Sequence, residues 1–277
     1  MSIVKRLRSL LGYSALPKLG VDRGYVIGTG WWCDGSGTHE GAQVSATQSD
    51  EAIRGRDFFR LWLWFINKYT NPDKIIVADS ASPVRPELPE DPRIEFLSMK
   101  KNWGHFVGCD YSLMCGVERA HLAVAFYALL NDSDLIYVEQ DCLVAGEGWV
   151  DECYRALGSK QVMFGAGKRT PQPIQQSLAL VRWEYLPVFI NRLLDQYVRH
   201  RSILLSSSPD PNLHNTEHRW RDAFARDVCH VPFGYGRARP IDFSAKHIYA
   251  QHWTEPELRE LMQREGLDPA EWLEDKA

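Results

Sequence analysis

The sequence predicts an α/β fold in which a mostly parallel central sheet is flanked by helices and followed by a less regular C-terminal half. Three short apolar runs, at 25–30, 74–79 and 135–138, indicate the sheet. Each run is too short for a core helix but has the length of a strand buried on both faces. Longer segments separate them, and the order strand, helix, strand favours parallel pairing through right-handed crossovers.

The separating segments have helical periodicity. The first predicted helix begins at a cap near Ser49 and ends at Asn71-Pro72, with apolar residues spaced as on a core-facing helix. The second runs from about Leu113 to Leu130 and is apolar nearly all round, so we expect it to be buried. We further expect helices at 149–157, 186–197 and 216–228, strands at 93–97, 161–165 and 177–182, and irregular structure at 240–250.

Composition narrows the class of partner. The formal net charge of −4 argues against a nucleic-acid partner held by phosphate neutralisation. The six cysteines form no CxxC pair, which predicts free thiols in a reducing compartment and hence a cytoplasmic protein. Residues 3–11 place apolar side chains on one helical face beside basic residues. They are interpreted either as an arm packed on the domain or as a helix at the inner face of the membrane.

Two carboxylates stand where the strand at 135–138 ends. Glu139 and Asp141 are one residue apart, and in extended backbone such residues point to the same side. Ligands of α/β folds bind at the carboxyl ends of the parallel strands. Oxygen ligands at this edge suit a divalent cation that also holds a ligand's phosphates. From these residues alone, a solvated acidic turn is the alternative.

The first strand is predicted to run into a turn at Gly28-Thr29-Gly30. A dinucleotide-binding loop does not fit, because the third glycine of that fingerprint is missing and no helix follows directly. A glycine- and serine-rich loop at 31–50 follows instead, and we interpret it as one wall of a ligand cleft. Candidate platforms for a sugar or a base are Trp31, Trp32, Trp103 and Trp183.

In their order and spacing, these elements and motifs resemble the GT-A glycosyltransferases, the nucleotide-diphospho-sugar transferase fold, over roughly residues 25–253. The metal-binding D-x-D motif of that family corresponds to Glu139-Gln140-Asp141, in which the first acid is Glu. The resemblance also implies a nucleotide site at the ends of the first two strands, at an N-x-G turn and at an arginine early in the buried helix. Its residues are Thr29, Gly30, Asp79, Ser80, Asn102, Gly104, His105 and Arg119.

The resemblance implies a hexosyltransferase-type enzyme of polysaccharide biosynthesis that moves a sugar from a nucleotide-diphosphate donor to a glycan or lipid-linked acceptor. Mn²⁺ or Mg²⁺ would neutralise the departing diphosphate as a Lewis acid. GT-A enzymes often take a further metal ligand from a C-terminal histidine, for which His252 is the first choice and His247 the second.

An inverting member of the family also needs a carboxylate base for the acceptor hydroxyl. Glu217 is the first candidate and Asp222 the second. A glutamate in the first turn of a helix is also favoured by the helix dipole without any catalytic role. A retaining enzyme would not use such a base, and the sequence does not separate the two stereochemistries.

Two other functions remain open. A sugar-phosphate nucleotidyltransferase would normally show a basic signature in its first loop, whereas no Lys or Arg occurs between Gly30 and Arg54. A non-catalytic nucleotide- or glycan-binding module would bind without turnover. We expect one GT-A-like domain over 1–277, composed of an N-terminal arm (1–22), a nucleotide-binding half (23–145), an acceptor-side half (146–253) and a helical tail (254–277).

Overall fold

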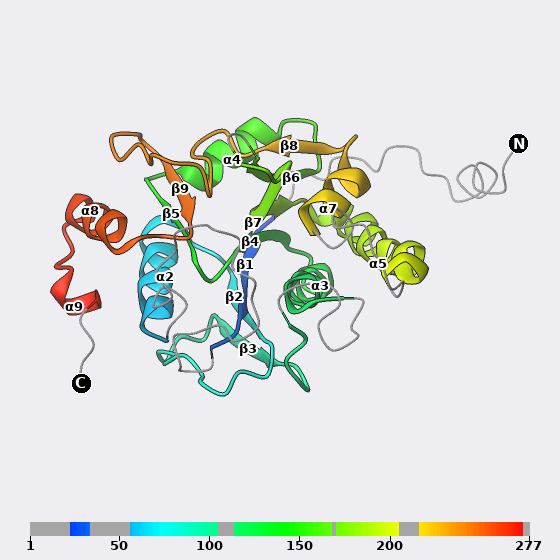
Figure 1. Ribbon diagram of the computed structural model, residues 1–277, viewed down its shortest axis with the longest axis horizontal. Helices are drawn as coiled ribbons and strands as arrows, with labels where there is room; N and C mark the ends of the chain where they lie inside the picture. Colours follow the sequence, from blue (N-terminus) through cyan, green and yellow to red (C-terminus); the bar gives the residue numbers. More distant parts are fainter. Residues whose placement is uncertain (1–22, 34–55, 105–113, 168–169, 205–215, 274–277) are drawn as a thin grey trace, which may run out of the picture.

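The computed structural model describes residues 23–33, 56–104, 114–167, 170–204 and 216–273. Within these residues a seven-stranded sheet has the order β3-β2-β1-β4-β7-β6-β8, and β5 and β9 form a separate two-stranded sheet (Figure 1). The strands are β1 Tyr25–Trp31, β2 Lys74–Asp79, β3 Ile94–Ser98, β4 Asp134–Val138, β5 Cys142–Ala145, β6 Val162–Ala166, β7 Ile174–Val181, β8 Val228–His230 and β9 Ile248–Gln251.

The predicted fold class is confirmed. Strands β1, β2, β3 and β4 pair in parallel, β7 is antiparallel to both β4 and β6, and β8 is parallel to β6. The sheet is therefore mixed but mostly parallel. Because β1, β2 and β4 run in the same direction, their carboxyl ends meet at one edge, which is the edge at which α/β folds bind ligands.

Helices cover both faces of the parallel strands. Figure 1 shows α2 on one face and α3 on the other. Alternate strand residues supply two separate cores, so that Ile75 and Val77 pack on the α2 side while Ile76 and Ala78 pack on the α3 side. Burial on both faces explains the continuous apolar runs in the sequence.

The helices are α2 Arg56–Tyr69, α3 Gly116–Leu130, α4 Trp149–Leu157, α5 Leu186–Leu204, α7 Thr216–Phe224, α8 Glu255–Glu265 and α9 Ala270–Leu273, with a 3₁₀ turn η3 at Trp183–Tyr185.

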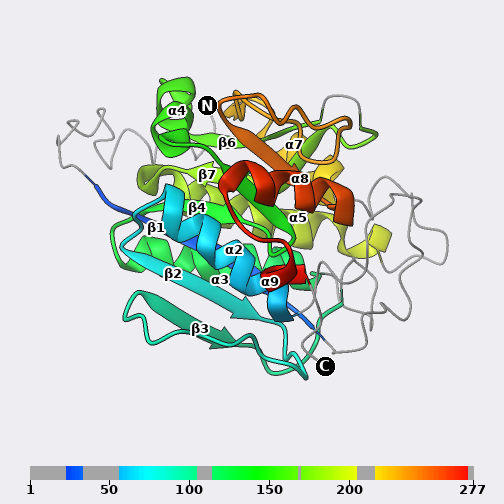
Figure 2. The same cartoon turned by 90° about the vertical axis from the view of Figure 1, so that its left-hand side faces the viewer.

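The C-terminal helices lie outside α2 (Figure 2). Helix α8 begins with a capping box between Thr254 and Glu257, a spacing visible in the sequence. Its Leu258, Leu261 and Met262 are buried in the same core as α2. Helix α9 is tied to α2 by a hydrogen bond from Arg60 Nη2 to the carbonyl of Glu271 (2.6 Å).

Two glycines let α3 approach β1 closely. The predicted turn at Gly28-Thr29-Gly30 is wrong, because β1 continues through these residues to Trp31. A Cβ atom at Gly28 would lie 2.2 Å from Val124 Cγ1, and one at Gly30 would lie 2.9 Å from Tyr137 Oη and 3.1 Å from Ala120 Cβ. The glycine pair is therefore a packing feature of a strand.

Several predicted boundaries are corrected. The buried helix begins at Gly116, the helix at Leu186 extends to Leu204, and the helix at Thr216 ends at Phe224 because β8 follows. The strand predicted at 177–182 occupies Ile174–Val181, and the irregular stretch at 240–250 contains most of β9. The predicted start of the first helix near Ser49 lies outside the described residues, as does most of the loop at 31–50.

One composition-based prediction, that of free thiols, bears on the described residues. Cys33, Cys115, Cys142 and Cys153 are free and buried, and Cys229 is free and partly exposed, which confirms the predicted free thiols. Cys109 and the N-terminal residues 3–11 lie outside the described part of the chain. Over that part, no helix combines the length and the apolar character needed to cross a membrane.

Candidate active site

The two predicted metal ligands flank a turn between β4 and β5. The backbone N–H of Cys142 donates to the carbonyl of Glu139 (2.9 Å), so residues 139–142 fold back instead of continuing as extended backbone. The predicted reason for convergence of Glu139 and Asp141 is therefore wrong, although both remain at the strand end. Glu139 N–H donates to the carbonyl of Ser177 on β7 (2.8 Å), and Asp141 is 2% exposed.

His252 lies beside Asp141 because β5 pairs with β9. The antiparallel register places Cys142 opposite Gln251, so the residues just beyond this pair are neighbours. His252 Nε2 is 3.6 Å from Asp141 Oδ2. His252 has a left-handed backbone conformation (φ 57°), which is rare for a residue other than glycine and is concentrated at functional sites.

The second histidine candidate lies at the other end of the same strand. His247 precedes β9, whose first residue Ile248 pairs with Ala145. On the rise of a β-strand, His247 is on the order of 15 Å from His252. Its Nε2 makes a hydrogen bond with the carbonyl of Glu147 (2.9 Å). The geometry favours His252 over His247 as a partner of Asp141.

The donor atoms of Asp141 and His252 suit a divalent cation. Within the described ranges, no group of three or more His, Cys, Asp or Glu side chains lies close enough together to hold a metal ion. Such a group is not required, because Mg²⁺ at phosphate sites is usually bound by one or two carboxylates together with substrate phosphates and water. A carboxylate and an imidazole are both ligands that Mn²⁺ accepts. The pair therefore fits a cation that a bound diphosphate would complete.

Gln140 locks the end of β1 onto the acidic turn. Its Oε1 accepts from the backbone N–H of Trp32 (2.8 Å), and its Nε2 donates to the carbonyl of Trp32 (3.2 Å). The sequence reasoning treated Gln140 only as the spacer of the motif. An amide between two acids at a strand end was the available signal, because an amide side chain can both donate to and accept from one backbone residue.

Two residues predicted to bind the nucleotide fix the loop after β2. Asp79 is 1% exposed, its Oδ1 accepts from Ser82 N–H (2.9 Å), and its Oδ2 accepts from Ser98 Oγ (2.9 Å). Ser80 Oγ accepts from the backbone N–H of Trp103 (3.2 Å). These bonds hold the β2 end to the segment after β3, and a contact with the nucleotide stays a prediction for both residues.

The N-x-G turn and the predicted arginine come together at the start of α3. Asn102 Oδ1 accepts from Gly104 N–H (2.9 Å), and Gly104 needs its positive φ of 74° for this turn. The carbonyl of Gly104 accepts from Gly116 N–H (2.7 Å). The Arg119 guanidinium lies 3.6 Å from the centre of the Trp103 ring, and burial lowers the pKa of Arg119. Trp103, a candidate platform, is thus stacked on a cation.

The remaining nucleotide-side candidates differ in position. Thr29 is fully buried within β1, and its Oγ1 donates to the carbonyl of Gly30 (3.2 Å). His105 lies outside the residues that the structure describes. Trp31 was a candidate platform but is a core residue, since it is 2% exposed and packs edge-on against Phe59.

The first candidate for the catalytic base is buried beside an arginine. Gln176 Nε2 donates to Thr216 Oγ1 (3.0 Å) and so anchors the start of α7 on β7. Glu217 is 7% exposed, and its Oε1 lies 3.4 Å from Arg237 Nη1. Asp222, the second candidate, has a side chain that is 68% exposed and pairs with Arg221. Geometry therefore favours Glu217 as a group held in a defined position.

Arg237 also reaches the strand that ends at the candidate metal pair. With its amide oriented to satisfy its neighbours, Gln251 accepts through its side-chain oxygen from Arg237 and donates to Ser177 Oγ. Ser177 Oγ in turn bonds Tyr249 Oη (2.6 Å). Because Gln251 precedes His252, this network joins the Glu217 carboxylate to the residue next to the Asp141–His252 pair.

Sequence reasoning missed the polar residues that support this network. Gln175, Gln176 and Ser177 are all buried on β7. Gln175 Nε2 donates to the carbonyls of Ala166 and Tyr235 (both 2.7 Å), and its Oε1 accepts from Arg237 N–H (2.9 Å). The available signal was three adjacent polar residues at the start of an apolar strand, because buried polar groups require partners.

No protein-family model matches the sequence, and no curated protein sequence matches it either. Among solved structures, the chain is similar to the galactosyltransferase LgtC in complex with donor and acceptor sugar analogues (TM-score 0.48, 11% identity, covering 89% of this chain and 98% of that one). It is similar to the WbbM bifunctional glycosyltransferase (TM-score 0.44, 12% identity, covering 78% of this chain and 40% of that one), of whose length it spans less than half. It is also similar to a putative glucose-1-phosphate thymidylyltransferase from Bacillus anthracis (TM-score 0.42, 8% identity, covering 88% of this chain and 96% of that one).

Glycosyltransferases are thus among the solved structures that resemble this chain, as its motifs predicted. At these identities the likeness concerns the fold alone, and the same fold can serve different reactions. The function has to follow from the site.

Proposed function

We propose that this protein is a glycosyltransferase that moves a sugar from a nucleotide-diphosphate donor to a glycan or lipid-linked acceptor. The observation that carries the proposal is the approach of His252 to Asp141, 3.6 Å apart, beside the carboxyl end of β4. The two residues are far apart in the sequence and meet only through β5 and β9. Their ligand atoms suit a cation held at the edge where α/β folds bind phosphates.

In this proposal Asp141 and His252 hold Mn²⁺ or Mg²⁺, with Glu139 in the same turn. When bound, the cation neutralises the charge that develops on the departing diphosphate. The Gln140–Trp32 clamp keeps the turn in place against the end of β1. The turn at Asn102 to Gly104, with Arg119 beside it, lies at the start of α3 and supports the nucleotide side.

For an inverting reaction, Glu217 is the proposed base that accepts the proton of the acceptor hydroxyl. It is buried and held beside Arg237, whereas Asp222 is exposed to solvent on the same helix. A group that takes a proton must lie at a fixed place relative to the reacting hydroxyl, and only Glu217 satisfies this condition among the two candidates.

The test is a calorimetric titration of UDP, GDP, CDP and dTDP with and without Mn²⁺. We expect one nucleotide to bind in a metal-dependent manner. Asp141→Ala and His252→Ala should each weaken its binding by about 100-fold, corresponding to ~3 kcal/mol, because each removes a ligand of the cation. His247→Ala is the matched control, since it removes an imidazole at the opposite end of β9 and should leave the affinity unchanged.

The outcomes separate the three functions. If no nucleotide binds in the presence of Mn²⁺, the transferase proposal fails. Metal-dependent binding without any sugar transfer or donor hydrolysis would identify a non-catalytic module. Formation of a nucleotide sugar from a sugar 1-phosphate and a nucleoside triphosphate would identify a nucleotidyltransferase.

A further inference from the structure

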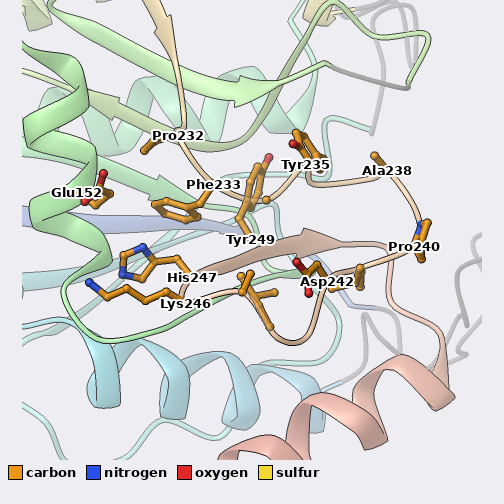
Figure 3. Close-up of a pocket in the computed structure, with 14 residues that line it drawn as sticks. Glu152, Pro232, Phe233, Tyr235, Ala238, Pro240, Asp242, Lys246, His247 and Tyr249 are labelled. Carbon is orange, nitrogen blue, oxygen red and sulfur yellow. The ribbon is translucent and has the colours of Figure 1, made fainter.

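A cavity of about 440 Å³ lies between α4, β9 and the segment that connects β8 to β9 (Figure 3). None of the residues assigned to the nucleotide, the cation or the base lines it. Its volume falls within the range of about 300–1,000 Å³ that is typical of small-molecule sites. The lining combines aromatic rings with ionisable side chains, which is the usual composition of a ligand pocket.

The chemistry of the lining favours an uncharged polyhydroxylated ligand. Phe233 and Tyr235 supply aromatic surface, and Tyr235 is 44% exposed. Figure 3 shows Glu152, Lys246 and His247 toward one end of the cavity and Asp242 toward the other. A sugar has C–H faces, which pack on the negative face of an aromatic ring, and hydroxyl groups, which both donate to carboxylates and accept from an ammonium group.

A phosphate-bearing ligand fits less well. The carboxylates Glu152 and Asp242 outnumber the ammonium group of Lys246 among the lining residues. His247 already makes a hydrogen bond through Nε2 to the carbonyl of Glu147. An anion placed in this pocket would therefore meet net negative charge, whereas a neutral saccharide would not.

The wall of the pocket is held in a fixed shape. Gly234 and Gly236 both have φ of 59°. A Cβ atom at Gly234 would lie 2.6 Å from the carbonyl oxygen of Tyr249, and one at Gly236 would lie 2.0 Å from Gln175 Oε1. Gln175 also holds the carbonyl of Tyr235 and the N–H of Arg237. The segment thus lies directly against β9 and β7, as expected of a preformed site.

The same segment reaches the candidate active site. Arg237 pairs with Glu217 (3.4 Å), and Arg239 Nη2 donates to the carbonyls of Gln251 (2.9 Å) and His252 (2.8 Å). Ala238 lies between these two arginines in the sequence and lines the pocket. One side of the segment therefore contacts the groups assigned to catalysis, and the other side faces the cavity.

We propose that this pocket binds a neutral sugar unit of the acceptor glycan at a distance from the hydroxyl that reacts. The acceptor role rests on the proposed function, whereas saccharide binding can be measured separately. Tyr235 and Phe233 pack on the sugar ring, and Asp242 and Lys246 bond its hydroxyl groups. An acceptor held here is positioned by the segment that also fixes Glu217.

The test is saturation-transfer NMR on the full chain with glucose, lactose, maltose, cellobiose and diacetylchitobiose. We expect at least one sugar to bind, and Tyr235→Ala and Phe233→Ala should each weaken its binding by about 3- to 10-fold, the typical worth of one aromatic contact. Phe126→Ala is the matched control, because Phe126 is also 44% exposed but lies on α3. Melting temperatures of all variants verify that the fold is intact.

A second arm separates this inference from the proposed function. Titration of the four nucleoside diphosphates with Mn²⁺ should give the same affinity in Tyr235→Ala as in the wild type. The absence of binding by every sugar, or equal sugar binding in the wild type and both aromatic variants, overturns the pocket assignment while leaving the nucleotide result intact. Sugar binding that depends on Tyr235, without any nucleotide binding, supports the pocket and removes its acceptor role.

Discussion

The two halves of the seven-stranded sheet are built on different principles. In the parallel half, the interior of β2 is apolar over four consecutive buried residues, Ile75 to Ala78. In the antiparallel half, β7 has Gln175, Gln176 and Ser177 directly after its first residue, and these are also buried. Burying such groups is unfavourable unless they are bonded, and these bond the segment before β9, the start of α7, and Tyr249.

The difference shows what each half contributes. Apolar burial holds the parallel strands and the helices on their faces, and it has no preferred direction. Hydrogen bonds are directional, so the polar residues of β7 can hold particular loops in particular places. The segments that they hold carry Glu217 and Arg237. The parallel half is therefore an apolar scaffold with the candidate nucleotide and metal residues at the ends of its strands, and the antiparallel half positions the candidate acceptor-side groups.

The largest predicted effect comes from breaking the ion pair that joins α3 to α7. Arg219 Nη2 lies 2.6 Å from Glu118 Oε1, and the two side chains are 1% and 6% exposed. Glu118→Ala leaves the Arg219 charge buried without this partner, so we expect a loss of about 3–5 kcal/mol in the free energy of unfolding. Urea unfolding followed by circular dichroism measures the loss.

The control for this prediction is a surface pair of the same residue types. Glu255 and Arg259 pair on α8 with side chains 55% and 43% exposed. Glu255→Ala should cost less than about 1 kcal/mol because solvent screens the pair. Equal losses in Glu118→Ala and Glu255→Ala would show that the ion pair does not hold the two halves together.

The next effect is a pH dependence that arises at the same junction. His121 of α3 stacks on Tyr137 of β4 (ring centres 3.5 Å apart), and its Nδ1 bonds the carbonyl of Val117 (2.9 Å). Burial lowers the pKa of His121 from 6.5 to about 4. Between pH 6.5 and pH 4, His121 therefore binds a proton in the unfolded chain but stays neutral in the folded chain. The free energy of unfolding consequently decreases as the pH drops from 6.5 to 4, by about 3 kcal/mol in total.

The pH effect is measured as a difference between two proteins. Burial raises the pKa of Glu118, so its contribution to the free energy of unfolding increases as the pH falls, which is opposite to the contribution of His121. In His121→Leu only the histidine contribution is removed, and the difference in unfolding free energy between wild type and variant should shrink from pH 7 to pH 4. A difference that is constant with pH would contradict the assignment.

The smallest predicted effect compares the interiors of the two halves directly. Gln175→Leu removes the partner of Tyr235 O and Arg237 N, which should cost about 1–3 kcal/mol and speed amide hydrogen exchange over 231–240. Ile76→Val in the parallel half should lower the free energy of unfolding by about 0.5–1.5 kcal/mol without altering amide exchange over 231–240. Similar exchange in both variants would mean that β7 does not position this segment.

Part of the site was visible in the sequence because it follows from local patterns. The acids at 139 and 141 end an apolar run, and the Asn102 turn needs a glycine two residues on. The Gln140 clamp and the buried Gln175 were not recognised, since their partners Trp32 and Arg237 are 108 and 62 residues away. The pocket beside β9 was missed for the same reason, because the stretch that lines it has no periodic pattern.

The sequence by itself determined the order of strands and helices from β1 to β4, their parallel pairing and the capping box of α8, whereas β5, β8 and β9 were not predicted and α3, expected to be buried, exposes Phe126 and Leu130. The features that it determined depend on periodicity and caps, which act within a few turns of chain. Only the tertiary structure decided that Asp141 meets His252 and that Glu217 meets Arg237. Both contacts depend on how distant segments dock, and in the first case on the register of a four-residue ladder between β5 and β9. A shift of one residue in such a ladder would turn every side chain to the other face, and no local pattern records that choice.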